Sequence, residues 1–184
     1  MKLLNWLSGQ RVHLSSSQRQ RLASLPPAVA GNDLPLLQGR LLVLDLETSG
    51  LNIYRDQVLS IGAVAIERGG IAMGEQFEAT LRRPGHKVTE AVLLHGIAPS
   101  ALARGCAAAD ALLDFLQFAA GAPLFAFHAP FDQRMLGRSL KQDLGYRWHQ
   151  RMLDVAEMAP MLCPEARVGR GGLDDWLQYF GLNN

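Results

Sequence analysis

Cysteines are scarce in this sequence, long apolar runs are missing and neither charge sign dominates, and each of these features excludes a class of protein. The two cysteines, Cys106 and Cys163, lack C-x-x-C spacing, which indicates neither a disulfide framework nor a zinc site. No apolar run approaches the roughly 20 residues that cross a bilayer, and the N-terminus lacks a secretory signal. We therefore expect a cytoplasmic protein with no membrane partner. A net charge of +1 argues against a coat for long nucleic acids, but not against an enzyme that holds a few nucleotides.

The composition suits one globular domain with an extension. Of the 184 residues 48% are apolar and 19% charged, which is enough to bury a sizeable core. Residues 1–38 form a locally basic N-terminal extension and linker, in which three serines at 15–17 predict a short capped helix that Pro26-Pro27 ends. This extension could contact DNA or a partner, or it could pack on the surface of the domain at 39–184.

From residue 40 onward the hydrophobic pattern predicts a mixed sheet. Strands come first as a meander and then alternate with helices, which is typical of an α/β fold with a central mixed β-sheet flanked by α-helices. The predicted strands are 41–47, 57–70, 71–81, 124–127 and a weak one at 150–154, and the predicted helices are 107–120, 131–140 and 173–181.

Two carboxylates stand out at the end of the first strand. Asp45 and Glu47 are two residues apart, so in a strand both side chains project from the same face. Burying two like charges is costly unless a cation or protons neutralise them. The alternative is that the strand has ended and both side chains are solvated. Their place at the carboxyl end of a strand favours a ligand site, because α/β sheets bind ligands there.

A third carboxylate, Asp132, follows the strand at 124–127 and opens a helix. On its own it could simply complement the helix N-terminus. If the strands at 41–46 and 124–127 are neighbours, Asp132 converges on Asp45 and Glu47. Three hard oxygen ligands with no interleaved Cys or His suit Mg²⁺ or Mn²⁺ rather than Zn²⁺. Two such ions about 3.5–4 Å apart serve phosphodiester hydrolysis.

Four segments resemble the DEDD superfamily of 3′–5′ exonucleases, and within it the His-subclass proteins similar to the DNA polymerase III epsilon (proofreading) subunit and its stand-alone relatives. These segments are VLDLETSGL (43–51), VLSIGAVAI (58–66), LLHGIAPSAL (93–102) and FHAPFDQRML (127–136). The resemblance implies a ribonuclease-H-like fold. It also implies a two-metal exonuclease that uses Mg²⁺ or Mn²⁺ to release nucleoside 5′-monophosphates from single-stranded or frayed 3′ ends of DNA.

Residue by residue, the resemblance makes Asp45, Glu47 and Asp132 the catalytic metal ligands. Glu90 and His95 match positions that contact the 3′-terminal nucleotide; on spacing alone Glu90 reads as an exposed first-turn acid and His95 as a helix cap. Three further residues would lie at the substrate: Thr48, Leu51 and His128.

The sequence departs from the family in two places. Phe127-His128 stands where the family has His-Asn, so His128 would have to replace the asparagine. The third motif, H-x-x-x-x-D with the general-base His and the last metal-binding Asp, belongs just beyond Asn184. We do not count Asp174 and Asp175 as replacements, and Asp154 matches a family position outside the four metal-binding acids. We expect a domain truncated before that motif, poorly active as it stands and active when extended by a few tens of residues.

Two other functions stay open. A degenerate nuclease fold could act as a nucleic-acid or protein binding module, which the missing motif and the altered His-Asn pair favour. An exonuclease of the same superfamily could act on RNA, since 2′-OH discrimination depends on pocket detail. A polymerase or repair partner is a further hypothesis.

Overall fold

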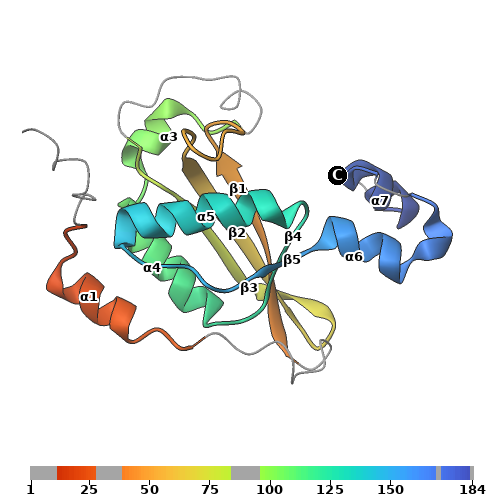
Figure 1. The fold of residues 1–184 in the computed structure, drawn as a ribbon, viewed down its shortest axis with the longest axis horizontal. Coiled ribbons are helices and arrows are strands. Elements are labelled where there is room, and N and C mark those ends of the chain that lie inside the picture. Colours follow the sequence, from red (N-terminus) through yellow and green to blue (C-terminus); the bar gives the residue numbers. More distant parts are fainter. Residues whose placement is uncertain (1–11, 28–38, 84–95, 169–170, 183–184) are drawn as a thin grey trace, which may run out of the picture.

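The computed structural model describes residues 12–27, 39–83, 96–168 and 171–182. Five strands form one sheet in the order β3-β2-β1-β4-β5 (Figure 1). Strand β2 runs antiparallel to its two neighbours, β1 and β3, whereas β4 and β5 run parallel to β1. The predicted mixed sheet is confirmed, and the condition that the first strand and the strand at 124–127 are neighbours is met. The strands are β1 (Arg40–Thr48), β2 (Val58–Glu67), β3 (Gly70–Thr80), β4 (Leu124–Ala126) and β5 (Met152–Asp154).

Two helices, α4 (Ala108–Ala119) and α5 (Ala129–Leu144), cover one face of the sheet. Alternate residues of β1 point into this layer, among them Leu42 and Leu44, which are at most 2% exposed. Phe115 of α4 is fully buried there. Such burial stabilises a side chain by roughly 1.5–3 kcal/mol, so the layer fixes α5 against β1. The remaining helices are α1 (Ser16–Ala23), α3 (Pro99–Arg104), α6 (Val155–Leu162), the 3₁₀ turn η1 (Pro164–Ala166) and α7 (Leu173–Tyr179).

Helix α5 is longer at both ends than the predicted 131–140. It starts at Ala129 because Pro130 sits in the first turn, where an N–H is not needed. It runs to Leu144 and ends at Gly145, whose φ of 66° is the left-handed conformation that glycine adopts without strain. Asp132 therefore lies in the first turn of a sixteen-residue helix.

The opposite face of the sheet carries an open groove in the described part of the chain. Asp45 of β1 faces it, together with residues of β2 and β3. The groove has a volume of about 560 Å³, within the range of about 300–1,000 Å³ found for ligand pockets. Its walls include Val43, Gly62, Val64, Gln76 and Glu78.

Residues 12–27 lie against α4. The side chain of Ser15 accepts a hydrogen bond from the N–H of Gln18 and so caps α1, as the serine run predicts. Leu22 packs on the core, and Arg21 forms an ion pair with Asp114 of α4 at 2.5 Å. At least one cation of the basic extension therefore meets acids of the domain itself.

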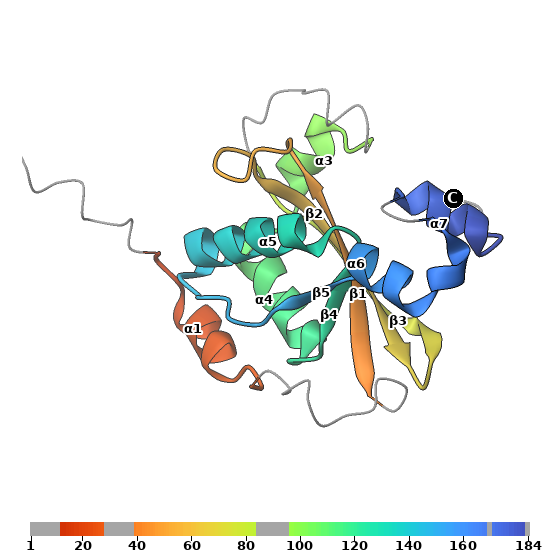
Figure 2. The same cartoon turned by 45° about the vertical axis from the view of Figure 1, so that its right-hand side comes forward.

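The helices α6 and α7 lie beyond the carboxyl end of β5, apart from α4 and α5 (Figure 2). In α7, Trp176 is 4% exposed and stacks on Phe180 at 6.1 Å between ring centroids. Among the described residues, no helix combines the length and apolarity that a bilayer crossing requires.

Candidate active site

Strand β1 carries both acids of the first motif on one face. Leu44 and Leu46 are 2% and 7% exposed on the helix-covered face, so the alternating residues Asp45 and Glu47 project to the other side. Asp45 is exposed and Glu47 partly exposed. The register of the β1–β2 pairing shifts between Glu47 and Thr48, so the regular pairing of the two strands ends directly after the acids.

Asp132 reaches the same strand from α5. The backbone N–H of Leu46, the residue between the two acids, favours the charged form of this carboxylate. The registered pairing of β1 with β4 ends at Val43 and Phe125, three residues before Leu46. The start of α5 therefore occupies the place on the edge of β1 that a longer β4 would take.

The surroundings of Asp132 disfavour its charged form. Burial and, next in size, the negative charge of Asp45 raise its pKa from 3.8 to about 7, with a smaller contribution from the charge of Asp154, while backbone N–H groups act against the shift. The side chain is 6% exposed. A raised pKa in a carboxylate cluster is a frequent sign of a functional site.

The chemistry of these donors fits a hard divalent cation, but the described residues show only part of a site. Asp45 and Asp132 offer oxygen ligands whose mutual repulsion a cation would relieve. The charges of Asp45 and Asp154 raise the pKa of Asp132, whereas Glu47 is not among the groups that affect it. Within residues 12–27, 39–83, 96–168 and 171–182, no three His, Cys, Asp or Glu side chains are grouped to hold a metal ion.

A tightly bonded loop at 49–57 follows the acids. The carboxylate of Asp56 accepts hydrogen bonds from Ser49 Oγ at 2.9 Å and from the N–H of Asn52 at 2.8 Å. It lies so close to Gly50 that a Cβ there would be 2.6 Å from Asp56 Oδ2. A side chain at position 50 would therefore displace this carboxylate from its hydrogen bonds, which accounts for the glycine there.

The loop displays apolar side chains beside the acids. Leu51 is 85% exposed and Tyr54 83% exposed. Thr48, by contrast, is 7% exposed, and its hydroxyl donates to the carbonyl of Gly50 at 2.9 Å. Of the substrate residues proposed from the sequence in this loop, Leu51 is presented to solvent and Thr48 shapes the turn. Tyr54, exposed in the same loop, was not singled out from the sequence, because no spacing rule marks a single exposed aromatic residue.

His128 occupies a strained position at the start of α5. Its φ of 62° is left-handed, a conformation in which Asn is several-fold enriched and His is tolerated. Its backbone N–H donates to Asp154 Oδ1 at 2.9 Å, and its exposed ring meets Phe127 edge to face at 4.6 Å. The backbone conformation thus explains the Asn-or-His choice at this position.

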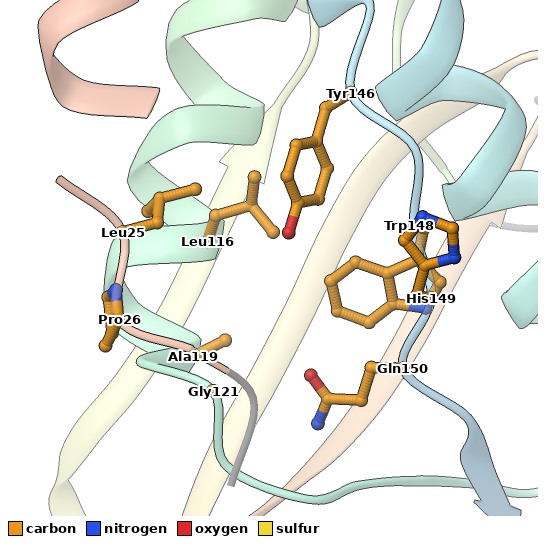
Figure 3. Close-up of a pocket in the computed structure, with 9 residues that line it drawn as sticks. All are labelled: Leu25, Pro26, Leu116, Ala119, Gly121, Tyr146, Trp148, His149 and Gln150. Carbon is orange, nitrogen blue, oxygen red and sulfur yellow. The ribbon is translucent and has the colours of Figure 1, made fainter. Parts of the chain in front are cut away.

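Asp154 also lies at the site, where its charge raises the pKa of Asp132, and it was not placed there from the sequence. Besides His128, it accepts a hydrogen bond from the N–H of Ala156 and so caps α6. His149 precedes it at H-x-x-x-x-D spacing, but the extended backbone between them separates the two side chains. His149 borders a different pocket, between α4 and the segment that leads to β5 (Figure 3). The predicted nucleotide contacts Glu90 and His95 lie outside the described residues.

The comparisons with known proteins agree with this architecture. The family model RNase_T, described as exonuclease, matches residues 42–184. The chain belongs to this exonuclease family, and it is therefore a member of the nucleases, a class of hydrolases.

Relatives with similar sequences carry polymerase names. DNA polymerase III PolC-type of Caldanaerobacter subterraneus subsp. tengcongensis is 33% identical over 155 residues, which are 84% of this chain and 11% of that protein. A DNA polymerase III subunit epsilon-like protein of Rhodobacter capsulatus is 38% identical over 108 residues, 58% of this chain and 15% of that protein. The chain thus spans only about a tenth to a seventh of these relatives' length.

Solved structures of exonuclease I share the fold. Exonuclease I of Methylocaldum szegediense superposes with a TM-score of 0.64 at 20% identity, over 79% of this chain and 36% of that chain. E. coli exonuclease I in complex with a dA16 oligonucleotide gives a TM-score of 0.66 at 15% identity, over 80% of this chain and 37% of that chain. These likenesses confirm the expected ribonuclease-H-like sheet.

Proposed function

We propose that the protein is a metal-dependent 3′–5′ exonuclease that removes nucleoside 5′-monophosphates from single-stranded or frayed DNA ends. The observation that carries this proposal is the contact of Asp132 with the backbone between Asp45 and Glu47, with its pKa raised by burial and by Asp45. The family membership supports hydrolysis of phosphodiesters.

In this proposal Asp45, Glu47 and Asp132 would hold Mg²⁺ or Mn²⁺. Bound cations would supply a nucleophile at neutral pH and stabilise the charge that develops on the phosphate. Around them, the loop at 49–57 would orient the last nucleotide, with Leu51 against its sugar and base. Glu90, His95 and His128 are proposed substrate contacts on the resemblance alone.

The experiment follows release of labelled mononucleotide from a 3′-labelled single strand in Mn²⁺. We expect nucleoside 5′-monophosphate as product and a loss of at least about 100-fold in Asp45→Asn and Asp132→Asn, since each removes charge stabilisation worth several kcal/mol. Glu67→Gln is the matched control, because Glu67 lies at the opposite end of β2 and pairs only with Arg40 at 3.4 Å. Release that is unaffected by either Asp substitution would refute the assignment.

A second candidate function is a binding module on a nuclease fold. One observation favours it: His128 stands where the family resemblance expects Asn, at the exposed start of α5. Strand binding without Asp132-dependent cleavage would support this function. A matched RNA strand in the same assay separates a DNA enzyme from an RNA-directed one.

A further inference from the structure

The surface beside the candidate site is more basic than the net charge of +1 suggests. Between Ala129 and Arg151 the chain has five cations and two acids. Both acids are engaged internally: Asp132 is buried, and Asp143 is bound by Arg83 at 3.2 Å. The cations are Arg134, Arg138, Lys141, Arg147 and Arg151, and none of them forms an ion pair with a described residue.

Three of these cations form a stripe on the outer face of α5. Arg134, Arg138 and Lys141 are four and three residues apart, so they share one side of the helix, opposite its buried side. Arg134 and Lys141 are exposed and Arg138 partly so. At 1.5 Å per residue the α5 stripe extends about 10 Å. It starts within one turn of Asp132.

The α5 stripe is connected to the loop that follows the acids. Arg138 Nη1 donates to the carbonyl of Ile53 at 2.6 Å, which fixes the loop against the middle of the helix. Next to Ile53 the loop presents the exposed side chains of Tyr54 and Arg55. The only acid of the loop, Asp56, is turned inward to Ser49 and Asn52. The contact of Arg138 with Ile53 therefore links the α5 stripe to a loop that follows the acids and exposes one cation and one aromatic ring.

The other side of α5 is bordered by the extended segment before β5. Trp148 lies beside Gly137, and both views show the segment running along α5 (Figures 1 and 2). Tyr146 and Trp148 line a pocket of about 70 Å³ with Leu25 and Pro26 (Figure 3). A cavity of about 150 Å³ is known to hold a benzene ring, and this pocket has about half that volume, so we do not place a nucleobase in it.

We propose that the α5 stripe, with Arg55, binds the phosphates of a single strand upstream of its 3′ end. Exposed cations without acid partners, next to an aromatic side chain, are the chemistry that recognises a single-stranded backbone without reading its sequence. A helical strand advances about 3.4 Å per phosphate, so the stripe faces about three phosphates. The inference rests on the proposed function only for the direction of the strand, because phosphate binding itself does not require cleavage.

The test compares Arg134→Gln/Lys141→Gln with a control that loses the same charge elsewhere. The control is Arg19→Gln/Arg68→Gln: Arg19 is exposed on α1, and Arg68 is exposed in the turn at the far end of β2. Anisotropy of a labelled 20-nucleotide strand is measured in EDTA, where hydrolysis is blocked, across a range of KCl. Each lost phosphate contact lowers the slope of log affinity against log salt by about 0.7. We expect a decrease of about 1.4 for the stripe variant and none for the control.

Cleavage of a labelled tetranucleotide separates the two proposals. The proposal for the α5 stripe is refuted if the salt slope of its variant equals that of the wild type or of the control. It is also refuted if the wild type binds no strand. In either case an acidic protein would be the next occupant to test. If the slope falls as expected but neither length is cleaved, the exonuclease assignment fails and the stripe stands. If the tetranucleotide is cleaved with Asp132 dependence and the slope is unchanged, only the stripe fails.

Discussion

The backbone N–H of Leu46 on β1 favours the charged form of the Asp132 carboxylate on α5, whereas the charge of Asp45, the residue before Leu46, disfavours it. A buried acid therefore lies next to a strand in which Leu46 is flanked by two acids, Asp45 and Glu47.

The stability of the protein should fall as pH rises through the acidic and neutral range. An unfolded Asp loses its proton near 3.8, whereas Asp132 in the fold keeps it to about 7. Between these values the folded state binds the additional proton, so the free energy of unfolding decreases with pH and levels off above 7. At about 1.36 kcal/mol per pKa unit the loss between pH 5 and 8 is roughly 3 kcal/mol.

Asp132→Asn is the matched variant, because the amide has nearly the same shape as the carboxyl group and does not ionise. In urea unfolding with EDTA, we expect the variant to gain stability relative to the wild type as pH rises from 5 to 8. A constant difference across this range would contradict the raised pKa.

Divalent cations should stabilise the protein more at high pH than at low pH. A carboxylate must lose its proton before it binds a metal, and with a pKa of about 7 the ionised fraction of Asp132 grows roughly tenfold between pH 6 and 8. Thermal unfolding with and without Mn²⁺ measures this effect, and Asp132→Asn should abolish it. Equal Mn²⁺ stabilisation at both pH values would show that the ion binds elsewhere.

Gly50→Ala should disturb the loop at 49–57. The added Cβ would lie 2.6 Å from Asp56 Oδ2, so the carboxylate must move and lose hydrogen bonds from Ser49 and Asn52. Displacing a buried or partly buried hydrogen bond costs about 1–3 kcal/mol. We expect a lower Tm and weaker binding of short strands. Gly74→Ala is the control, since a Cβ there meets nothing within 4 Å.

Tyr54 should contribute to strand binding through its ring. It is 83% exposed, and its N–H is held by Asn52 Oδ1 at 2.9 Å, so the ring is presented from a fixed backbone. Stacking on a base is worth about 1–3 kcal/mol. Tyr54→Ala should therefore weaken binding of a tetranucleotide about 5- to 150-fold with an unchanged Tm, while Tyr54→Phe should keep wild-type affinity. Equal effects of the two variants would exclude stacking.

Arg21→Ala should lower stability without changing any nucleic-acid measurement. Arg21 binds Asp114 and Gln117 on the outer side of α4, and its side chain is 26% exposed. Partly exposed pairs contribute at most about 1 kcal/mol. Urea unfolding should register a loss of this size, while the salt slope of strand binding stays at the wild-type value. A reduced slope would mean that the N-terminal segment takes part in binding.

Most strands and helices were predictable because their apolar residues repeat with clear periods. Leu42, Leu44 and Leu46 alternate with outward-facing residues in β1, and the α4 prediction of 107–120 differs from the observed Ala108–Ala119 by one residue at each end. Helix α3 was not predicted, since six residues are too few for a period to be seen. The ends of α5 differed because Pro130 and Gly145 act through capping rather than hydrophobicity.

The candidate site was only partly predictable. From the sequence, Asp132 comes close to Asp45 and Glu47 only if the strands at 41–46 and 124–127 are neighbours. The pairing of β1 with β4 meets this condition. The backbone N–H of Leu46 as partner of Asp132, and the charge of Asp154 beside it, depend on where β4 ends and on how α6 is capped. Such contacts arise from three-dimensional proximity and leave no spacing in the sequence. The metal ligands and nucleotide contacts remain predictions.

One carboxylate ties the C-terminal helices to the acids. Asp154 receives the amide of His128, where α5 begins, and the amide of Ala156, where α6 begins. The first turn of the helix that carries Asp132 and the first turn of α6 therefore share one anchor, so the loss of this single carboxylate would leave both helix starts without an acceptor.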